Sequence, residues 1–252
     1  MAASIKTRGI IVSEAPMGEQ DKRLAVLCVD KGKISAIAKG AKKPGGKLAS
    51  QTQLFYYCDF MLEQSRGFWI IREASVIESF YELRMELDYV AWASWMVETA
   101  QMLAVEGEAC NELIRLLLRG LRMLPAPQLS PQMTATAFVL RALAGQGLQP
   151  ETERCVLCGG LDLAGISAVS GGTLCRQCFH QTADVQAISG GGLYTLRHIL
   201  NAQEPVLYKF QASEEIRKTL FEFTRRFLHN YTQKELASLE FIRNLQQTSG
   251  SN

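Results

Sequence analysis

The chain has no long uninterrupted apolar run. Its longest apolar stretch, Val90 to Val105, is interrupted by four polar residues. Such a stretch is too short and too polar to cross a bilayer. The first six residues contain no apolar segment like that of a signal peptide. We therefore expect a cytoplasmic protein without a membrane partner.

Several catalytic and cofactor-binding motifs are also absent. None of the three histidines is followed two residues later by glutamate, as the H-x-E element of zinc deaminases requires. The basic segment ending at Lys47 lacks the first glycine and the final hydroxyl residue of a G-x4-G-K-[ST] phosphate loop. We also expect a strand rather than a helix after it, which excludes nucleotide hydrolysis. Because no Ser/His/Asp arrangement, catalytic carboxylate pair or Rossmann fingerprint is evident, we expect no enzymatic activity.

The composition is that of a globular protein with an uneven distribution of charge. With 252 residues and 47% hydrophobic content, the chain can bury a sizeable core in one to three domains. The net charge of +2 conceals ten Lys and Arg against four Asp and Glu within residues 1–50. A basic end of this kind indicates a polyanionic partner such as nucleic acid. A solvated basic face without a partner is the alternative.

The first eighty residues are rich in β-branched and aromatic residues, which is typical of strands. Asp30-Lys31-Gly32 and Ser65-Arg66-Gly67 supply hairpin turns. The pattern predicts a five-stranded closed barrel of the OB type, with an SH3-like barrel as the nearest alternative. The expected strands are Ile5–Ser13, Arg23–Val29, Lys33–Lys39, Leu54–Glu63 and Gly67–Glu78.

Aromatic residues of this region have two interpretations. Phe55 and Tyr57 share one face of the fourth expected strand, where either could stack on nucleic-acid bases. Alternatively, the aromatics of both faces fill the barrel core. Phe68 and Trp69 are interpreted as packing residues.

From Tyr81 onward the apolar residues follow a helical period of 3.6. Ser130 is expected to cap one helix, with Pro131 at its first position, and Gly190-Gly191-Gly192 is interpreted as a loop. We expect an α+β protein with a barrel domain at 1–80 and a helical domain at 81–252. Helices are expected at Tyr81–Val105, Asn111–Leu124, Ser130–Ala144, Gly192–Asn201, Ser213–Asn230 and Gln233–Leu245. The second of these carries Arg115, Arg119 and Arg122, which form either a second basic patch or a solvated helix face.

Four cysteines carry the strongest chemical signal. Cys155, Cys158, Cys175 and Cys178 read C-x2-C, sixteen residues, C-x2-C. This spacing is typical of structural zinc sites, and four thiolates complete the tetrahedral shell that zinc prefers. We predict one structural zinc ion per chain, in a module at about 150–182 inserted between helices. A redox pair or four core thiols are the alternatives, and His180 is a possible substitute ligand.

The other three cysteines, Cys28, Cys58 and Cys110, lie among apolar residues and are expected to be buried free thiols. An odd thiol count together with a zinc-type quartet favours a reducing cytosol.

A basic loop joins the third and fourth expected strands. Its lysines, Lys39, Lys42, Lys43 and Lys47, lie on a segment that is flexible by composition. Ammonium groups placed in this way neutralise phosphates without reading bases. We predict that these four residues bind DNA.

Several segments resemble the RecO family of bacterial DNA repair proteins. They are T-x-G-I-I-V-x-E-A-x-x-G-E-Q-D at 7–21, A-K-G-A-K-K at 38–43 and Q-L-F at 53–55, followed by C-x-x-C-G at 155–159 and S-G-G-x-L-C-x-x-C at 170–178. The resemblance implies an N-terminal OB-fold, a helical domain and a zinc-binding insertion. It carries the DNA-contact role onto Lys39, Lys42 and Lys43, although Pro44-Gly45-Gly46 is a glycine-rich departure from the family pattern.

The resemblance also implies a nucleoid-associated recombination mediator. Such a protein binds single- and double-stranded DNA, anneals complementary strands, and acts with RecR to load RecA onto strands coated by single-strand DNA-binding protein. It contacts the acidic, apolar C-terminal tail of that coating protein, for which the sequence identifies no pocket. The alternatives are a zinc-ribbon scaffold of a nucleic-acid complex without annealing activity, and an enzyme with an unrecognised pocket.

Overall fold

The computed structural model describes residues 4–65, 67–127 and 129–249, which belong to two compact units. The first unit contains the chain up to residue 86 together with residues 97–121. The second contains residues 87–96 and the chain from residue 122 onward. Among the described residues, no helix has both the length and the apolar character needed to span a membrane.

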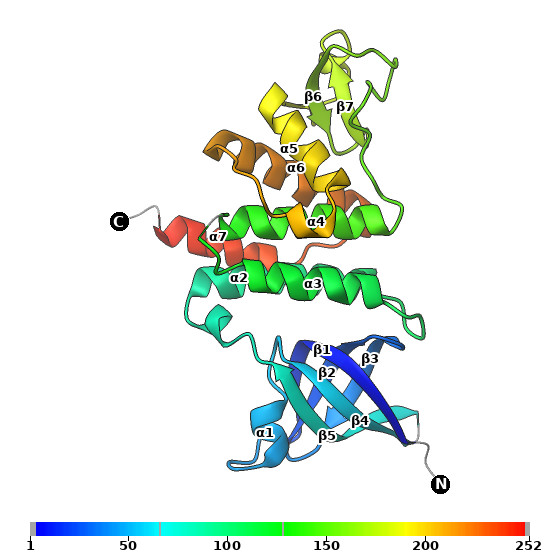
Figure 1. The fold of residues 1–252 in the computed structure, drawn as a ribbon, viewed down its shortest axis with the longest axis vertical. Coiled ribbons are helices and arrows are strands. Elements are labelled where there is room, and N and C mark those ends of the chain that lie inside the picture. The colour runs from blue at the N-terminus through cyan, green and yellow to red at the C-terminus, as the bar shows by residue number, and fades with distance from the viewer. Residues whose placement is uncertain (1–3, 66, 128, 250–252) are drawn as a thin grey trace. The chain divides into compact units, whose positions relative to one another are not determined.

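The first unit is built on a closed barrel (Figure 1). Its strands are β1 (Ser4–Met17), β2 (Asp21–Cys28), β3 (Gly32–Ala38), β4 (Tyr57–Ser65) and β5 (Phe68–Glu78). They follow the order β1-β2-β3-β5-β4, and β1 also pairs with β4 to close the barrel. The β3–β5 pair is parallel and the other pairs are antiparallel. The predicted OB-type barrel is confirmed.

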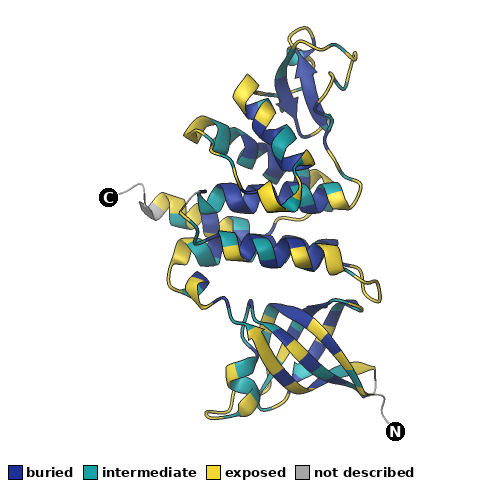
Figure 2. Cartoon of the chain, in the orientation of Figure 1, coloured by how far each residue is buried: buried dark blue, intermediate teal, exposed yellow. Residues whose placement is uncertain are grey.

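The barrel core follows from the alternation of side chains along the strands. Buried residues alternate with more exposed ones along β3 and from Arg23 to Val26 of β2, and Figure 2 shows the resulting stripes on the barrel. The inward residues form one cluster that contains Ile11, Leu24, Val26, Ile34, Phe60, Leu62 and Ile71. Trp69 packs against this cluster, as expected.

The residues just before β4 do not form the strand that the sequence predicts there. Pairing begins at Tyr57 rather than Leu54, because Phe55 has a left-handed backbone with φ of 71°. The Phe55 side chain is only 2% exposed, which agrees with the core interpretation of this residue and excludes base stacking by it. Arg84 holds this irregular segment by donating to the Leu54 carbonyl at 2.8 Å and by stacking over the ring of Tyr56.

Two further expectations about the barrel are corrected. Phe68 is 60% exposed at the start of β5, so its interpretation as a packing residue is wrong. The chain after Gly46 forms a short helix, α1 (Lys47–Gln51), rather than a strand. Leu48 of α1 packs against the barrel core, which explains why this segment turns inward. Of the two expected hairpin turns, Asp30-Lys31-Gly32 joins β2 to β3, and Arg66 of the other lies outside the described residues.

The helices are α2 (Leu87–Leu103), α3 (Asn111–Met123), α4 (Pro131–Gly145), α5 (Gly190–Asn201), α6 (Glu214–Thr232) and α7 (Ala237–Ser249). Short 3-10 turns occupy Tyr81–Arg84, Phe179–Gln181 and Glu204–Val206. The first of these separates Tyr81 from α2, so the expected helix from Tyr81 to Val105 is shorter. Ser130 caps α4 by accepting from the Met133 amide at 3.3 Å, as expected.

The glycine run at 190–192 is the first turn of α5, so its interpretation as a loop is wrong. Ser189 caps this turn by accepting from the Gly192 amide at 3.1 Å, and a helix start with an effective cap tolerates glycine. In the second unit α4 packs against α5 and α6. Trp92, Trp95 and Phe221 meet edge to face in this unit, with ring centroids 5.3–6.0 Å apart.

A small sheet lies between α4 and α5 along the chain. Its strands, β6 (Leu163–Ser167), β7 (Gly172–Cys175) and β8 (Gln186–Ala187), pair in the order β7-β6-β8. Gly172 permits the Glu151 backbone to approach closely, since a β-carbon there would meet the Glu151 carbonyl oxygen at 2.4 Å. The cysteine quartet is built on this sheet.

Candidate metal centre and nucleic-acid interface

The structure brings the four predicted cysteines together. The sulfur atoms of Cys155, Cys158, Cys175 and Cys178 all lie within 4.8 Å of one another, and those of Cys158 and Cys175 are 3.5 Å apart. A zinc–sulfur distance of about 2.3 Å places tetrahedral sulfurs roughly 3.8 Å apart. The cluster can therefore hold a metal ion with little adjustment.

The backbone shapes each C-x-x-C pair into a tight turn. The Cys155 amide donates to the Gly160 carbonyl at 2.8 Å, and the Gly159 amide donates to the Cys155 carbonyl at 2.9 Å. Gly159 has a φ of 77°, which strongly favours glycine. In the second turn the Cys178 amide donates to the Cys175 carbonyl at 3.1 Å. Both pairs thus direct their thiols to one centre.

The environment of the cluster favours a bound cation. Burial disfavours the Cys155 thiolate, but hydrogen bonds from the amides of Cys175, Cys158 and Leu157 lower its pKa to about 6. The neighbouring thiol of Cys158 and burial raise the pKa of Cys178 to about 12. Four clustered thiolates repel one another, so a cation at their centre is what allows all four to ionise.

His180 lies outside this cluster. It is exposed on the 3-10 turn that follows Cys178, and its ring packs edge to face against Phe179 at 5.2 Å. Among the described residues the metal-binding group consists of the four cysteines alone.

Arg197 attaches the cysteine module to α5. Its guanidinium donates to the Thr152 carbonyl at 3.1 Å and 2.5 Å, and pairs with Glu153 at 3.1 Å. The sequence does not signal this link, because it joins residues 45 positions apart. The segment entering the module is therefore fixed to a helix of the same unit.

The lysine loop leaves the barrel at the end of β3, and all four of its lysines are exposed. Turns with hydrogen bonds from Lys43 to Gly40 and from Gly46 to Lys43, both 3.0 Å, shape the loop. No ion pair joins Lys39, Lys42, Lys43 or Lys47 to any described residue. The loop therefore presents positive charge to solvent, although Glu63 lies close enough to Lys39 for the two charges to interact.

The sequence also offered Tyr57 as a base-stacking residue and the arginines of α3 as a second basic patch. Tyr57 is half-buried at the start of β4 and is paired in register with Glu78. On α3, Arg115 is exposed and forms an ion pair with Glu112, whereas Arg119 is half-buried. Pairing within the helix reduces the charge available to a partner, which favours the solvated-face interpretation.

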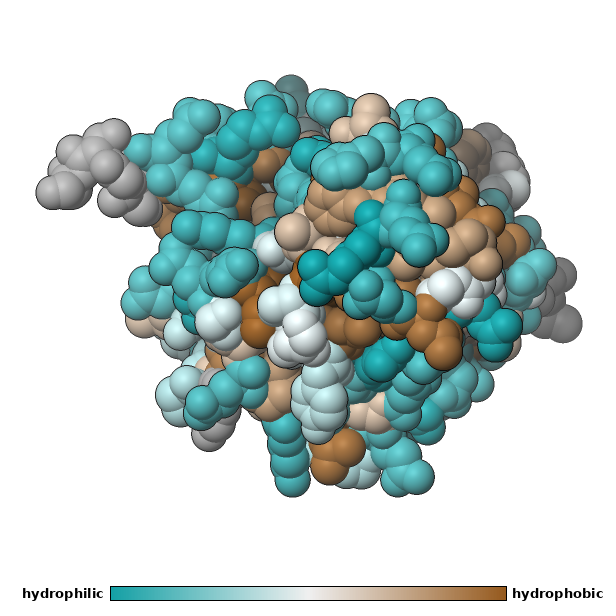
Figure 3. Space-filling model, turned by 90° about the horizontal axis from the view of Figure 1, so that it is seen from above, coloured by the Kyte–Doolittle hydropathy of each residue, from teal (hydrophilic) through white to brown (hydrophobic). Residues whose placement is uncertain are grey.

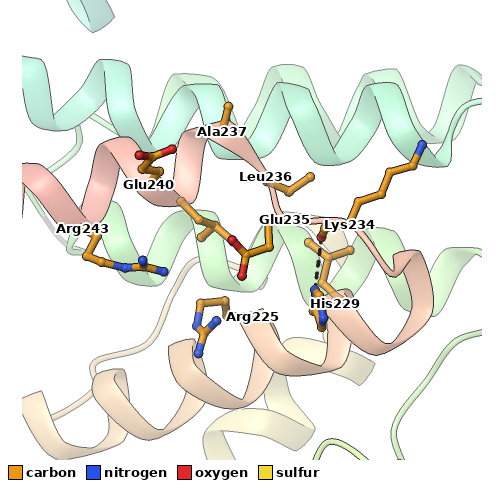
Figure 4. A pocket seen from close by; sticks show the side chains of 10 residues that line it. Arg225, His229, Lys234, Glu235, Leu236, Ala237, Glu240 and Arg243 are labelled. Carbon is orange, nitrogen blue, oxygen red and sulfur yellow. Dashed lines mark hydrogen bonds between the residues drawn. The ribbon is translucent and has the colours of Figure 1, made fainter.

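A pocket of about 410 Å³ lies between the end of α6 and the start of α7 (Figure 4). Arg225, Lys234 and Arg243 contribute positive charge, while Glu235 and Glu240 contribute negative charge. Apolar lining comes from Leu228, Leu236 and Leu239. The pocket depends on the left-handed turn at Gln233 that ends α6, so helical periodicity did not reveal it.

Apolar side chains are also exposed in the second unit. Leu157, Leu161 and Val169 belong to the cysteine module, and Tyr194 lies on α5. Figure 3 shows apolar patches between hydrophilic side chains on the face seen from above.

Comparisons with known proteins agree with this architecture. Residues 1–80 match the family model described as "Recombination protein O N terminal", and residues 84–240 match "Recombination protein O C terminal". A "DNA repair protein RecO" from Acetivibrio thermocellus is 31% identical over 243 residues, covering 96% of this chain and 97% of that protein. A protein of the same name from Pelotomaculum thermopropionicum is 30% identical and covers 94% of this chain and 93% of its own length. The chain therefore belongs to the RecO family of DNA repair proteins.

Proposed function

We propose that the protein is a recombination mediator that binds single- and double-stranded DNA through the lysine loop and anneals complementary strands. The observation that carries this proposal is the exposed group of Lys39, Lys42, Lys43 and Lys47 on an OB-type barrel. Family membership supports a role in DNA repair. Residues 1–80 would form the DNA-binding domain, and residues 81–252 a helical domain.

Phosphate contacts explain how such a protein can anneal strands. Lysine side chains hold the backbone by charge and carry no base information. The base edges stay free to pair with a complementary strand, and positive charge reduces the repulsion between the two backbones. No nucleotide hydrolysis is needed for this process.

The proposed ligand of the cysteine cluster is one structural zinc ion. Cys155, Cys158, Cys175 and Cys178 would fill all four positions, so no site remains for water or substrate. Zinc would join the turn at 155–158 to the turn at 175–178 and so stabilise a sheet with short strands. This role supports folding rather than chemistry.

We also propose that the second unit binds partner proteins. The resemblance points to RecR, to the acidic, apolar C-terminal tail of single-strand DNA-binding protein, and through them to RecA. The α6–α7 pocket offers Lys234 and Arg243 for carboxylates and leucine side chains for apolar residues. Because Glu235 and Glu240 share the lining, apolar contacts must contribute much of the affinity.

Annealing of complementary oligonucleotides without ATP tests the proposal. Purified protein should accelerate annealing of bare strands and of strands coated by single-strand DNA-binding protein. A zinc-ribbon scaffold would bind partners without accelerating either reaction. Absence of annealing under low-salt conditions that permit DNA binding would contradict the mediator function.

A further inference from the structure

A groove of about 300 Å³ lies on the outer surface of β1, β2 and β3 in the first unit. Ser13, Ala25 and Ser35 line it and are direct cross-strand neighbours. Leu24 and Ile34 also line it, but their side chains lie in the barrel core. They therefore contribute backbone, and the floor of the groove consists of main chain and very small side chains.

The stability of the barrel does not explain the small residues of this floor. Outer strand positions favour β-branched and aromatic residues, and alanine is depleted there. Serine and alanine at three neighbouring positions leave the sheet backbone open to a ligand that lies flat against it. In OB barrels the surface of the second and third strands commonly binds oligonucleotides.

Two cations flank the floor. Arg23 on β2 is exposed and Lys33 on β3 is half-buried, and both line the groove. Neither forms an ion pair within the part of the chain that the structure describes. Lys22, the neighbour of Arg23 on β2, is by contrast neutralised by Glu14 at 2.9 Å. Among its described lining residues the groove therefore carries two cations that form no ion pair, against the single carboxylate of Glu106, and this excess of positive charge suits a polyanion.

One end of the groove is continuous with the lysine loop. Arg23 is the register partner of Ile37, and Lys39 follows Ile37 by two residues. The Gly40 amide donates to the Asp21 carboxylate at 2.8 Å, which holds the start of the loop beside β2. A strand bound by the loop can thus pass directly onto the groove.

The opposite end is acidic. Glu106 lines the groove near Lys33 and is exposed. Its position is fixed by backbone hydrogen bonds from Gly107 to the Lys31 carbonyl at 2.9 Å and from Lys33 to the Val105 carbonyl at 3.4 Å. A carboxylate held there repels phosphates that extend beyond Lys33.

From these observations we infer that the groove is the path of a single DNA strand that continues from the lysine loop. Arg23 and Lys33 neutralise its phosphates, the serine–alanine floor receives its sugars and bases, and Glu106 ends the path. The inference rests on the proposed DNA-binding function and specifies where the bound strand runs on the barrel. Because Arg23 and Lys33 neutralise phosphates, which carry no base information, their contribution to binding is insensitive to base sequence.

The test is the affinity of the full-length protein for fluorescent oligothymidine, measured by anisotropy over a range of salt concentrations. The variant Arg23→Gln/Lys33→Gln removes two phosphate contacts and should flatten the slope of log affinity against log salt by about 1.4. Affinity should fall on the order of tenfold at 0.1 M salt. Lys6→Gln/Arg8→Gln, which removes the same charge from β1 where it pairs with β4, should have a clearly smaller effect.

Two single variants test the floor and the acidic end. Ala25→Leu, which fills the floor without changing charge, should weaken binding severalfold and leave the slope unchanged. Glu106→Gln, which keeps the backbone bonds of its segment, should strengthen binding severalfold. Melting curves confirm that each variant is folded.

The inferred path is overturned if wild-type protein binds oligothymidine but both double variants change the slope equally, or if Ala25→Leu binds normally. Failure of the wild type to bind would instead reject the DNA-binding function itself.

Discussion

The backbone amide of Lys42 donates a hydrogen bond to the carbonyl of Gln20 at 2.9 Å. The Lys42 ammonium group reaches the Gly18 carbonyl of the same turn at 3.3 Å. The loop that carries the lysines is therefore fastened to the turn between β1 and β2. Fixed cations lose less conformational entropy on binding phosphate than cations on a free segment do.

Metal analysis is expected to find one zinc ion per chain in protein purified under reducing conditions. Structural zinc in small modules contributes an apparent ~10–16 kcal/mol at neutral pH. Cys175→Ser should therefore lose the metal and unfold the cysteine module, whereas Cys110→Ser, at a half-buried thiol outside the cluster, should keep the full zinc content. Metal-free wild-type protein with a folded module would contradict the assignment.

Gly32→Ala should destabilise the first unit by about 2–4 kcal/mol. Gly32 has a φ of +60°, and a β-carbon there would meet the Val105 carbonyl oxygen at 1.9 Å and that of Glu108 at 2.4 Å. Gly18→Ala is a matched control, because Gly18 has a φ of +62° with no atom within 4 Å. The control should cost only the left-handed strain of about 1 kcal/mol. Equal shifts in the denaturant midpoint for the two variants would show that the close approach of residues 105–108 is unimportant.

Glu222→Gln should lower stability at neutral pH by about 1 kcal/mol. Burial alone would raise the pKa of Glu222, but hydrogen bonds from Arg225 and Arg226 dominate and lower it below its usual value of 4.5. A carboxylate with a lowered folded-state pKa contributes stability above its unfolded pKa, and that contribution disappears as pH falls through the folded pKa. Wild-type and variant midpoints should therefore differ at pH 7 and converge below about pH 4. A constant difference across this range would exclude the charge of Glu222 as the cause.

Lys234→Glu/Arg243→Glu should weaken binding of a synthetic acidic, apolar peptide with a free C-terminus by at least tenfold in calorimetry. The reversal places two more negative charges in the α6–α7 pocket, where like charges repel an acidic ligand. Lys209→Glu, at an exposed lysine outside the pocket, serves as the control. Equal affinities of all three proteins would place the peptide site elsewhere.

Sequence periodicity was sufficient for the barrel and most helices, because β3 alternates cleanly and Ser130 and Ser213 are effective caps. It failed where tertiary contacts override local preference. Phe55 adopts a left-handed backbone that phenylalanine does not favour, and α1 is too short to show a period. The sheet of β6, β7 and β8 is built from strands too short for an alternation signal.

The candidate sites divide in the same way. Cysteine spacing alone predicted the cluster, because two C-x-x-C turns impose their geometry locally, and the proximity of the sulfurs is confirmed. The groove beside Arg23 required strand register, since its floor joins residues from β1, β2 and β3. The α6–α7 pocket required the turn at Gln233. The role of the lysines stays a prediction.

The most direct test of DNA binding through the lysine loop is the salt dependence of a variant with Lys39, Lys42, Lys43 and Lys47 replaced by alanine. Each phosphate neutralised on single strands contributes roughly −0.7 to the slope of log affinity against log salt. If all four lysines bind phosphates, the slope should flatten by about 3, equally for different sequences, and annealing should fall with it. Zinc content and melting temperature should not change. A quadruple variant with the wild-type slope and annealing rate would remove the loop from the DNA site and contradict the proposed mechanism.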